Sequence, residues 1–349
     1  MADTSADAAL TVFSDADRLR LLGWSQAFSD QLSPDEIDLR PLRVSSVHRA
    51  RIDVIDADGP ADLQLPPNTN TADFAVGDWV LASPLTGDFV RRLERETVLQ
   101  RRTEGSHGQQ LAAANVDTLF IVTSCNADFN PARLERYLIM ANQAGTRPVI
   151  VLTKADTVDD AAAYETQARA LQRDLPIVTL NARSPDALEK LSPWCGPGET
   201  VALVGSSGVG KSTLVNTLAG SGIAAQQKTG EIRQHDAKGR HTTTARSLHA
   251  IAGGGWVIDT PGIRTLYVSD VTDGIDTLFA EITELAPLCR FRDCTHQHEP
   301  GCAVQAAIKD GSLDAGRLER WRGLLAENRE KTPVSSGPKG NKILRKKKY

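Results

Sequence analysis

The sequence predicts an α/β domain with a mostly parallel sheet, preceded by a small all-β barrel and followed by a small helical, metal-binding domain. Three observations predict this organisation. Residues 205–212 match the phosphate-loop pattern G-x-x-x-x-G-K-[ST] at every fixed position. Buried strands alternate with helical segments in the residues before that loop. Cysteines and histidines crowd together between positions 289 and 302.

A chain of 349 residues with 40% hydrophobic and 24% charged residues is typical of a globular protein of more than one domain. Its acidic N-terminus and the lack of a long apolar run favour a cytoplasmic protein without a signal peptide or membrane span. The net charge of −4 argues against a uniformly basic surface. Residues 331–349, however, form a basic tail that we expect to be disordered and suited to phosphate contacts.

Residues 1–36 form an N-terminal extension with a short amphipathic pattern. Residues 37–98 contain short alternating runs separated by turn signals, which predicts a closed barrel of the oligonucleotide-binding (OB) type. The runs are Leu42–Val44, Arg51–Ile55, Asp62–Leu65, Asp78–Leu81 and Asp88–Val90. Basic side chains favour a nucleic-acid face on this barrel, namely His48, Arg49, Arg51, Arg91, Arg92 and Arg95. A barrel that merely packs on its neighbour is the alternative.

Residues 99–270 read as βαβ units, and therefore as the α/β domain. The predicted strands are Thr118–Val122, Pro148–Leu152, Ile177–Leu180, Val201–Val204 and Trp256–Ile258. The predicted helices before the phosphate loop are Pro131–Gln143 and Asp159–Arg173. The sheet therefore begins well before its phosphate loop.

The phosphate loop lies between a strand and a helix, which is the context that phosphate binding needs. It consists of Gly205, Ser206, Ser207, Gly208, Val209, Gly210, Lys211 and Ser212, followed by Thr213. The glycines let backbone N–H groups close around a β-phosphate, and the helix N-terminus adds its positive dipole end. Lys211 reaches the β- and γ-phosphates, and the Ser212 hydroxyl coordinates Mg²⁺. A glycine-rich turn that matches by chance is the alternative, and the flanking elements argue against it.

The tetrapeptide Thr153-Lys154-Ala155-Asp156 follows a buried strand directly. Ligands of open α/β sheets bind at the carboxyl ends of strands, where this tetrapeptide falls. The Asp156 carboxylate can accept hydrogen bonds from N1–H and the 2-amino group of guanine, a donor pair that adenine lacks. Lys154 would lie along the base. The expected ligands are therefore GTP and GDP.

The γ-phosphate side of the site is predicted from two further stretches. Asp259-Thr260-Pro261-Gly262 ends a strand, so Asp259 can hold Mg²⁺ through water and the Gly262 N–H can contact the γ-phosphate. An ordinary Asp-Pro-Gly turn is the alternative. Residues 238–244 form a polar loop in which a threonine, Thr243 in our assignment, can complete the Mg²⁺ shell when GTP is bound.

The base-reading motif precedes the phosphate loop, opposite to the order in Ras-like GTPases, so the domain looks circularly permuted. The motifs, the G-R-H-T-T-T loop at 239–244 and the cysteine cluster resemble the RsgA (YjeQ) family of bacterial ribosome-biogenesis GTPases. The resemblance covers about residues 38–310. It implies an OB domain, a permuted GTPase domain and a C-terminal zinc-binding domain, acting late in maturation of the small (30S) ribosomal subunit. Two stretches depart from the usual GTPase pattern: Thr153 stands in place of Asn, and Thr179-Leu180-Asn181-Ala182 in place of Ser-Ala.

Ile263 stands where Ras-like enzymes carry the glutamine that orients the attacking water. We therefore expect slow intrinsic hydrolysis and stimulation by a partner. The hypothesis is that His241 positions the water once the partner is docked. An exposed or phosphate-contacting histidine is the alternative.

Cys289, Cys294, His296 and Cys302 suit one tetrahedral, structural Zn²⁺ per chain. His298 is the rival fourth ligand by spacing, and the family resemblance favours His296. Reduced buried cysteines are the alternative to a metal site. This cluster belongs to a domain at residues 271–330, in which the helical pattern Leu313–Arg329 should pack over the metal loop.

The predicted function is a GTPase switch that binds the small ribosomal subunit and its ribosomal RNA, as a monomer. The alternative is an RNA-binding or chaperone module in which GTP only stabilises the fold. An ATP-dependent kinase is a third possibility, against which the motif ending in Asp156 argues.

Overall fold

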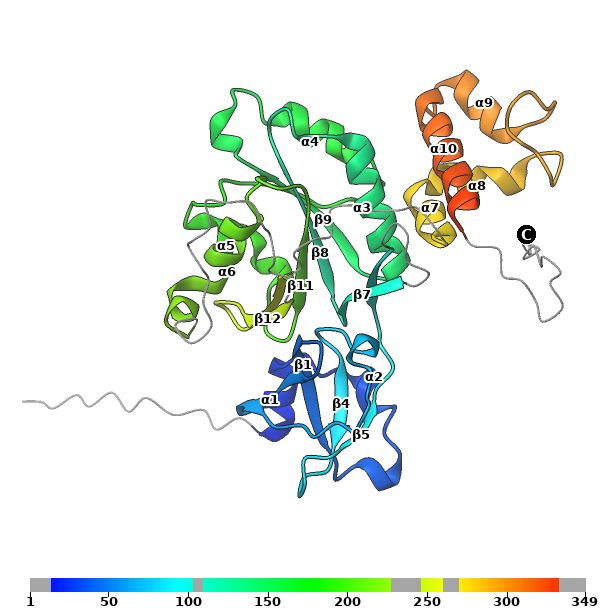
Figure 1. Ribbon diagram of the computed structural model, residues 1–349. Coiled ribbons are helices and arrows are strands. Elements are labelled where there is room, and N and C mark those ends of the chain that lie inside the picture. Colours follow the sequence, from blue (N-terminus) through cyan, green and yellow to red (C-terminus); the bar gives the residue numbers. More distant parts are fainter. Residues whose placement is uncertain (1–13, 103–108, 227–245, 260–269, 333–349) are drawn as a thin grey trace, which may run out of the picture.

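The computed structural model describes residues 14–102, 109–226, 246–259 and 270–332. The expected site residues His241, Thr243 and Gly262, together with Ile263, lie outside the described residues, as do residues 333–349 of the expected basic tail. Within the described residues, a barrel, a central α/β part and a group of C-terminal helices follow one another along the chain (Figure 1). No helix among these residues is long and apolar enough to cross a membrane.

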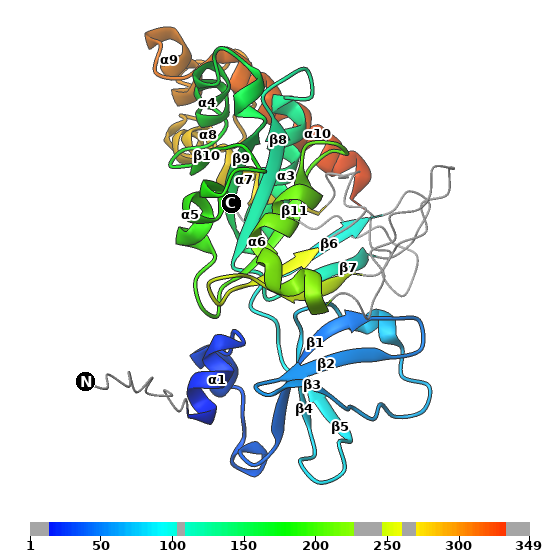
Figure 2. The same ribbon diagram turned by 90° about the vertical axis from the view of Figure 1, so that its left-hand side faces the viewer.

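The N-terminal segment forms short helices that cover the barrel. They are α1 (Asp15–Leu21), α2 (Gln26–Ser29) and the 3₁₀ turn η1 (Pro34–Glu36). A capping box between Ser14 and Asp17 starts α1. Trp24 and Phe28 then pack against the buried ring of Trp79 in the barrel, with ring centroids 4.9 and 5.9 Å away. The amphipathic pattern of this segment therefore reflects docking on the barrel, beside which α1 lies in Figure 2.

The barrel has the strand order β3-β2-β1-β4-β5. Its elements are β1 (Arg40–Val47), β2 (Ile52–Asp56), β3 (Gly59–Ala61), η2 (Thr71–Asp73), β4 (Trp79–Ala82) and β5 (Phe89–Arg92). A parallel bridge between Gln64 and Asp88 connects the two ends of this order, so the barrel closes. The prediction of a third strand at residues 62–65 is wrong. These residues form only the bridge at Gln64, and the third strand, β3, lies earlier, at Gly59–Ala61. Pro66 and Pro67, which follow, cannot donate to a ladder.

The central sheet has the order β10-β9-β8-β11-β13-β12, with β12 antiparallel and its other members parallel. The strands are β8 (Thr118–Ser124), β9 (Arg147–Thr153), β10 (Ile177–Thr179), β11 (Thr200–Val204), β12 (Ser247–Ala250) and β13 (Trp256–Asp259). The helices and turns are α3 (Pro131–Ala144), η3 (Ala155–Thr157), α4 (Ala162–Arg169), α5 (Asp186–Leu191), η4 (Ser192–Trp194) and α6 (Lys211–Gln226). The predicted α/β domain is confirmed, although α4 is shorter than expected.

Alternate residues of each parallel strand face two separate apolar cores, as the period of a strand requires. In β8, Leu119 and Ile121 join the core that includes α3, while Phe120 and Val122 join the core that includes α5 and α6. The sheet is therefore covered by helices on both faces (Figure 1).

The barrel and the central sheet are continuous through β12. Ser46 of β1 pairs with Ser247 of β12, and the Ser46 hydroxyl also donates to the Arg246 carbonyl at 3.1 Å. A separate hairpin of β6 (Val98–Arg102) and β7 (Gln109–Ala114) links the two parts along the chain. Strand β1 of the barrel and strand β12 of the central sheet, which lies beside the expected site, are thus neighbours in one sheet.

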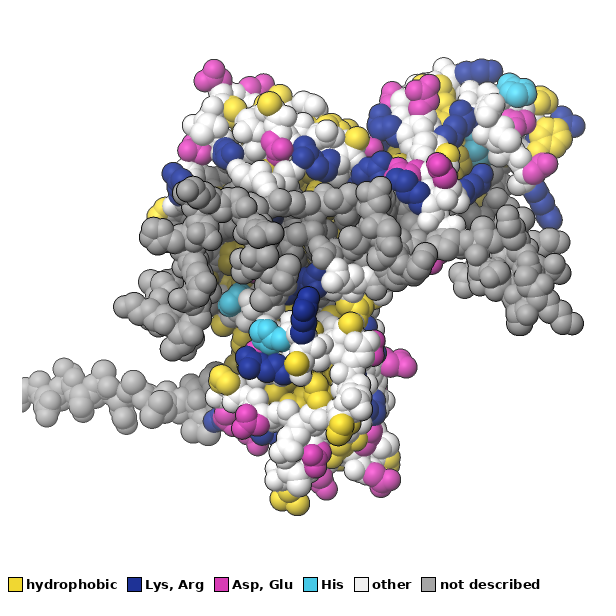
Figure 3. Space-filling model, viewed as in Figure 1, with side chains coloured by type: hydrophobic (Ala, Val, Ile, Leu, Met, Phe, Trp, Pro, Cys, Tyr) yellow, Lys and Arg dark blue, Asp and Glu magenta, His cyan; other side chains and the backbone are white. Residues whose placement is uncertain are grey.

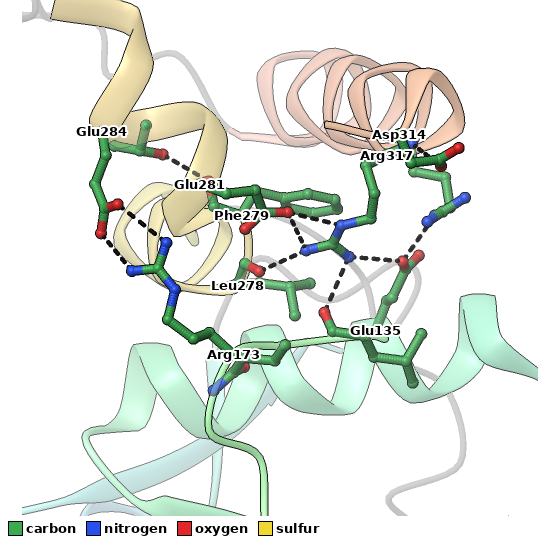
Figure 4. A network of polar contacts seen from close by, with 12 residues as sticks. Glu135, Arg173, Leu278, Phe279, Glu281, Glu284, Asp314 and Arg317 are labelled. Atoms are coloured by element: carbon green, nitrogen blue, oxygen red, sulfur yellow. Dashed lines mark hydrogen bonds and ion pairs between the residues drawn. The ribbon is translucent and has the colours of Figure 1, made fainter. Parts of the chain in front are cut away.

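The C-terminal helices pack on α3. They are α7 (Thr272–Leu278), α8 (Ala280–Leu285), η6 (Ala286–Leu288), α9 (Ala303–Asp310) and α10 (Ala315–Lys331). Arg317 of α10 lies over the Phe279 ring at 4.2 Å, and its guanidinium donates to the carbonyls of Leu171 and Leu278 at 2.9 Å each. It also forms ion pairs with Glu135 of α3 and Glu281 of α8 (Figure 4). One buried arginine therefore joins the C-terminal helices to the central domain.

Candidate nucleotide site and metal centre

The phosphate loop leaves the sheet at its centre. Every residue of β11 is buried, and the chain turns at Gly205 to enter α6 at Lys211. Gly205 has φ +142°, and a Cβ there would lie 2.1 Å from the Val122 carbonyl of β8. Only glycine fits this close passage. The backbone geometry that the sequence pattern predicted is therefore present.

Lys211 is held on the loop itself. Its ammonium donates to the carbonyl of Gly205 at 2.8 Å and to that of Ser206 at 2.5 Å. These contacts fold the side chain from the N-terminus of α6 back over the start of the loop, next to the backbone N–H groups that a phosphate would meet. Ser212 is exposed in the first turn of the same helix.

The Thr153 side chain joins the predicted base-reading motif to the phosphate loop. Thr153 ends β9 and is 1% exposed. Its hydroxyl lies 2.5 Å from the Val209 carbonyl, to which it donates, and 3.2 Å from that of Thr123. This residue, which stands where GTPases usually carry Asn, is thus attached to the phosphate loop by its hydroxyl. Lys154, at φ +56°, then turns the chain so that Asp156 is exposed.

The segment after β10 reaches the same place. Thr217 of α6 donates from its hydroxyl to the Ala182 carbonyl at 2.8 Å. Asn181, one residue earlier, accepts from the Arg183 N–H at 2.9 Å and forms a local turn. The stretch Asn181-Ala182, which departs from the usual GTPase sequence, is therefore attached to the helix of the phosphate loop.

Asp259 lies at the end of β13, opposite Ser247 in the antiparallel register. Loss of hydration raises the pKa of Asp259, and the nearby charges of His249 and Lys211 lower it. The Ser247 hydroxyl lies 2.7 Å from Nε2 of His249. Ser247 and His249 are two apart on β12 and so share the face of Asp259. Sequence reasoning missed them, because only the strand register places them there.

A third residue that sequence reasoning missed is Arg133, in the first turn of α3. Its Nη1 donates to the Ser206 hydroxyl of the phosphate loop. The available signal was topological, because α3 follows β8, the strand beside β11. The order of strands in the sheet cannot be read from the sequence, so the sequence did not predict that Arg133 lies next to the phosphate loop.

The candidate metal-binding cluster lies in the loop between η6 and α9. The ligand atoms of Cys289, Cys294, His296 and Cys302 all lie within 4.8 Å of one another. His296 Nδ1 is 3.5 Å from the sulfurs of Cys289 and Cys302, and those sulfurs are 3.8 Å apart. Bonds of about 2.3 Å to sulfur and 2.0 Å to nitrogen require tetrahedron edges of about 3.8 and 3.5 Å. The ligand atoms of Cys289, His296 and Cys302 therefore have the spacing of a tetrahedral metal site, with Cys294 close by.

His296, and not His298, belongs to this cluster. His296 is 5% exposed, whereas His298 is exposed to solvent. Burial, together with the nearby charge of Arg322, lowers the pKa of His296, which favours the neutral ring that binds metals. Trp321 and Arg322 of α10 both contact this histidine, through its ring and its carbonyl respectively. The prediction that a C-terminal helix packs over the metal loop is confirmed.

Of the six basic residues expected on the barrel, His48 lies 2.8 Å from the Asp53 carboxylate and Arg92 donates to the Leu93 carbonyl at 3.0 Å. The other four divide into two groups. Arg91 and Arg95 form ion pairs with Glu36 and Asp78, each at 2.6 Å, and so serve the fold. Arg49 and Arg51 are exposed in the turn between β1 and β2. Basic and histidine side chains gather on the upper part of the barrel in Figure 3.

A sequence model of the RsgA GTPase family matches residues 92–269, which include the phosphate loop and the base-reading motif. The small ribosomal subunit biogenesis GTPase RsgA of Mesorhizobium japonicum is 68% identical over 321 residues, covering 92% of this chain and 93% of that protein. The chain belongs to the RsgA GTPase family. RsgA 2 of Vibrio parahaemolyticus is 45% identical over 319 residues, covering 91% of this chain and 87% of that protein.

Solved structures of related GTPases have the same fold. YjeQ from Thermotoga maritima aligns with a TM-score of 0.60 and 25% identity, over 83% of this chain and 98% of that one. YloQ, described as a circularly permuted GTPase, aligns with a TM-score of 0.60 and 25% identity, over 86% of this chain and 99% of that one. Membership of the RsgA family therefore agrees with the permuted order in which β9 and its motif precede the phosphate loop.

Proposed function

We propose that this chain is a GTP-hydrolysing switch that acts in biogenesis of the small ribosomal subunit. The observation that carries the proposal is the hydrogen bond from Thr153 to Val209, which joins the guanine-type motif to the phosphate loop. The names of the M. japonicum and V. parahaemolyticus relatives support the ribosomal part.

In this proposal the nucleotide lies along the carboxyl edge of the sheet. Residues 205–213 hold the phosphates, and residues 153–156 hold the base. Ser212, Thr243 and Asp259 complete the surroundings of Mg²⁺, and the Gly262 N–H contacts the γ-phosphate. Mg²⁺ would neutralise charge that develops on the phosphate oxygens during hydrolysis.

The base assignment is tested with Asp156→Asn. The carboxylate accepts the guanine N1–H and 2-amino hydrogens, so its loss should weaken GTP binding about 10- to 100-fold. The new amide can donate to the C2 carbonyl of xanthine, so binding of xanthosine triphosphate should improve. Unchanged preference for GTP over xanthosine triphosphate would contradict the assignment.

We also propose that His241 positions the attacking water, since Ile263 cannot. His241→Ala should lose most of the turnover that ribosomal subunits stimulate, while GTP binding is retained. Full stimulated turnover by this variant would overturn the role of His241.

For the metal centre we propose one structural Zn²⁺ per chain. Three cysteine sulfurs and one imidazole match the preference of zinc, and a fourth protein ligand leaves no open position for catalysis. The metal would hold the loop between η6 and α9 against α10.

We propose that residues 37–98 and the basic tail contact ribosomal RNA, that residues 99–270 bind GTP, and that residues 271–330 carry the metal. The proposed location is the cytoplasm, and the proposed state is a monomer. The decisive experiment measures GTP hydrolysis by the purified chain with and without small ribosomal subunits, with ATP and large subunits as controls. Stimulation by small subunits alone is expected. Turnover that no subunit changes would favour an RNA-binding module in which GTP only stabilises the fold.

A further inference from the structure

The phosphate loop is supported from outside its own strand and helix. The Arg133 guanidinium donates from Nη1 to the Ser206 hydroxyl and from Nη2 to the Asp128 carbonyl at 2.9 Å. The Asp128 carboxylate lies 3.4 Å from the same nitrogen. One planar group therefore bridges the phosphate loop and the loop that follows β8.

The backbone at Arg133 is fixed by the start of its helix. Asn130 caps α3 by accepting the Arg133 N–H at 3.0 Å, and Pro131 occupies the first turn. Within the preceding loop, the Asn126 side chain accepts from the Ser124 hydroxyl and the Asp128 N–H, both at 2.9 Å. The Arg133 side chain therefore extends from a turn whose backbone is held by several hydrogen bonds.

The C-terminal helices also bind α3 close to Arg133, through Glu135 and Arg136. Glu135, which is 2% exposed, accepts from Arg317 and from Arg320 of α10, the latter at 2.9 Å. Arg136 forms a bidentate ion pair with Glu327, with hydrogen bonds of 2.8 and 2.6 Å. Figure 4 shows Glu135 on α3 facing Arg317 of α10. These contacts attach the first half of α3 to α10.

Ser206 connects Arg133 to the catalytic lysine. Its hydroxyl accepts from Arg133, and its backbone carbonyl accepts from the Lys211 ammonium at 2.5 Å. Two consecutive hydrogen bonds thus run from α3 to the ammonium group. A rotation of the Ser206 peptide would move Lys211 relative to the phosphates.

We propose that Arg133 is a positioning residue for GTP hydrolysis, which acts on Lys211 through Ser206. This inference rests on the proposed function. Misplacement of a reacting or stabilising group by about 1 Å can cost about 100-fold in rate. A lysine at position 133 would keep the charge, but it could not bridge Ser206 and Asp128 as a planar guanidinium does.

The test compares Arg133→Ala, Arg133→Lys, Ser206→Ala and the double variant Arg133→Ala with Ser206→Ala. Arg173→Ala is the matched control, because Arg173 forms an exposed ion pair with Glu284. The readouts are kcat and KM for GTP in the presence of small ribosomal subunits, together with the melting temperature.

Arg133→Ala and Ser206→Ala should each lower kcat about 10- to 100-fold, with a smaller change in KM and in melting temperature. The double variant should be no slower than the slower single variant, because both remove the same link. Arg133→Lys should remain impaired, and Arg173→Ala should match the wild type. A wild-type rate in Ser206→Ala, fully additive losses or complete rescue by lysine would each overturn the proposal. If Arg133→Ala fails to fold, the Ser206→Ala variant tests the proposal by itself, because it removes only the hydroxyl oxygen that accepts from Arg133.

If the proposed GTPase function is wrong, the experiments give a different result from the one expected if only the role of Arg133 is wrong. Lys211→Ala should abolish hydrolysis if the phosphate loop works as proposed. A wild-type protein that does not hydrolyse GTP, or a Lys211→Ala variant as active as the wild type, would remove the basis for both proposals. Normal wild-type turnover with an unaffected Ser206→Ala would remove only the role of Arg133.

Discussion

The Arg43 guanidinium donates to the Thr200 hydroxyl at 2.8 Å and so joins barrel strand β1 to β11, the strand that leads into the phosphate loop. The same side chain donates to the Leu22 carbonyl, at the end of α1, at 2.5 Å. Arg43 is 1% exposed, and burial lowers its pKa to about 10, so it is still charged at neutral pH. Nearby Asp117 has a pKa raised by burial. The N-terminal segment, the barrel and the central domain therefore meet on one buried cation.

Arg43→Met should lower the free energy of unfolding by about 3 to 5 kcal/mol. The substitution leaves the Leu22 carbonyl and the Thr200 hydroxyl without this donor, and it removes one of the two arginine charges near Asp117. Urea unfolding measures the change. Arg18→Ala is the control, since its ion pair with Asp58 is exposed, and it should cost less than about 1 kcal/mol. Equal costs for the two variants would contradict the structural role of Arg43.

Thr153→Val should weaken GTP and GDP binding about 2- to 10-fold, because it removes the hydroxyl that donates to the Val209 carbonyl but keeps the side-chain shape. Equilibrium titration with a fluorescent guanine nucleotide measures the affinity. Thr157→Val is the control, because that hydroxyl donates only locally, to the Lys154 carbonyl at 2.8 Å. Affinity at the wild-type value in Thr153→Val would show that this hydrogen bond does not shape the base site.

His296→Ala should lose the bound metal, whereas His298→Ala should keep it, because only His296 lies among the cysteine sulfurs. Metal content of the purified variants and their melting curves distinguish the two. A chelator should destabilise the C-terminal helices of the wild type, since metal binding and folding are coupled in such sites. Metal retained by His296→Ala and lost by His298→Ala would reverse the ligand assignment.

Acidification should weaken the contact between α3 and α10. The hydrogen bond between Glu327 and Arg136 holds the pKa of Glu327 at about 2, below the ordinary value of 4.5. Because the folded-state pKa is depressed, the pair stabilises the protein fully above pH 4.5, and this contribution is lost as the pH falls toward about 2. Arg136 stays charged throughout.

The measurement compares melting temperatures of the wild type and Glu327→Gln across that window. The difference should be largest above pH 4.5 and should shrink toward pH 2, which isolates Glu327 from the other carboxylates. Glu330→Gln, an exposed change on the same helix, is the control. A wild-type advantage that stays constant with pH would rule out this ion pair as its source.

The sequence predicted the central sheet and the strand, loop and helix around Lys211, and it named the Cys/His cluster that the fold brings together, because each depends on short-range features. Val201–Val204 is a buried strand, and the glycines beside Lys211 have backbone freedom that no other residue has. The third barrel strand was misplaced because a regular alternation at 62–65 precedes two prolines that block a ladder.

What the sequence by itself determined is the nucleotide class, the permuted order of motifs and the cysteine spacing, since these are properties of consecutive residues. The tertiary structure decided which groups support them. Arg43 and Thr200 are 157 positions apart, and Arg133 and Ser206 are 73 apart. The choice between His296 and His298, and the placement of Ser247 and His249 beside Asp259, follow from burial and strand register. Such contacts form only when the sheet orders its strands, because sequence spacing carries no information on which distant side chains share an edge.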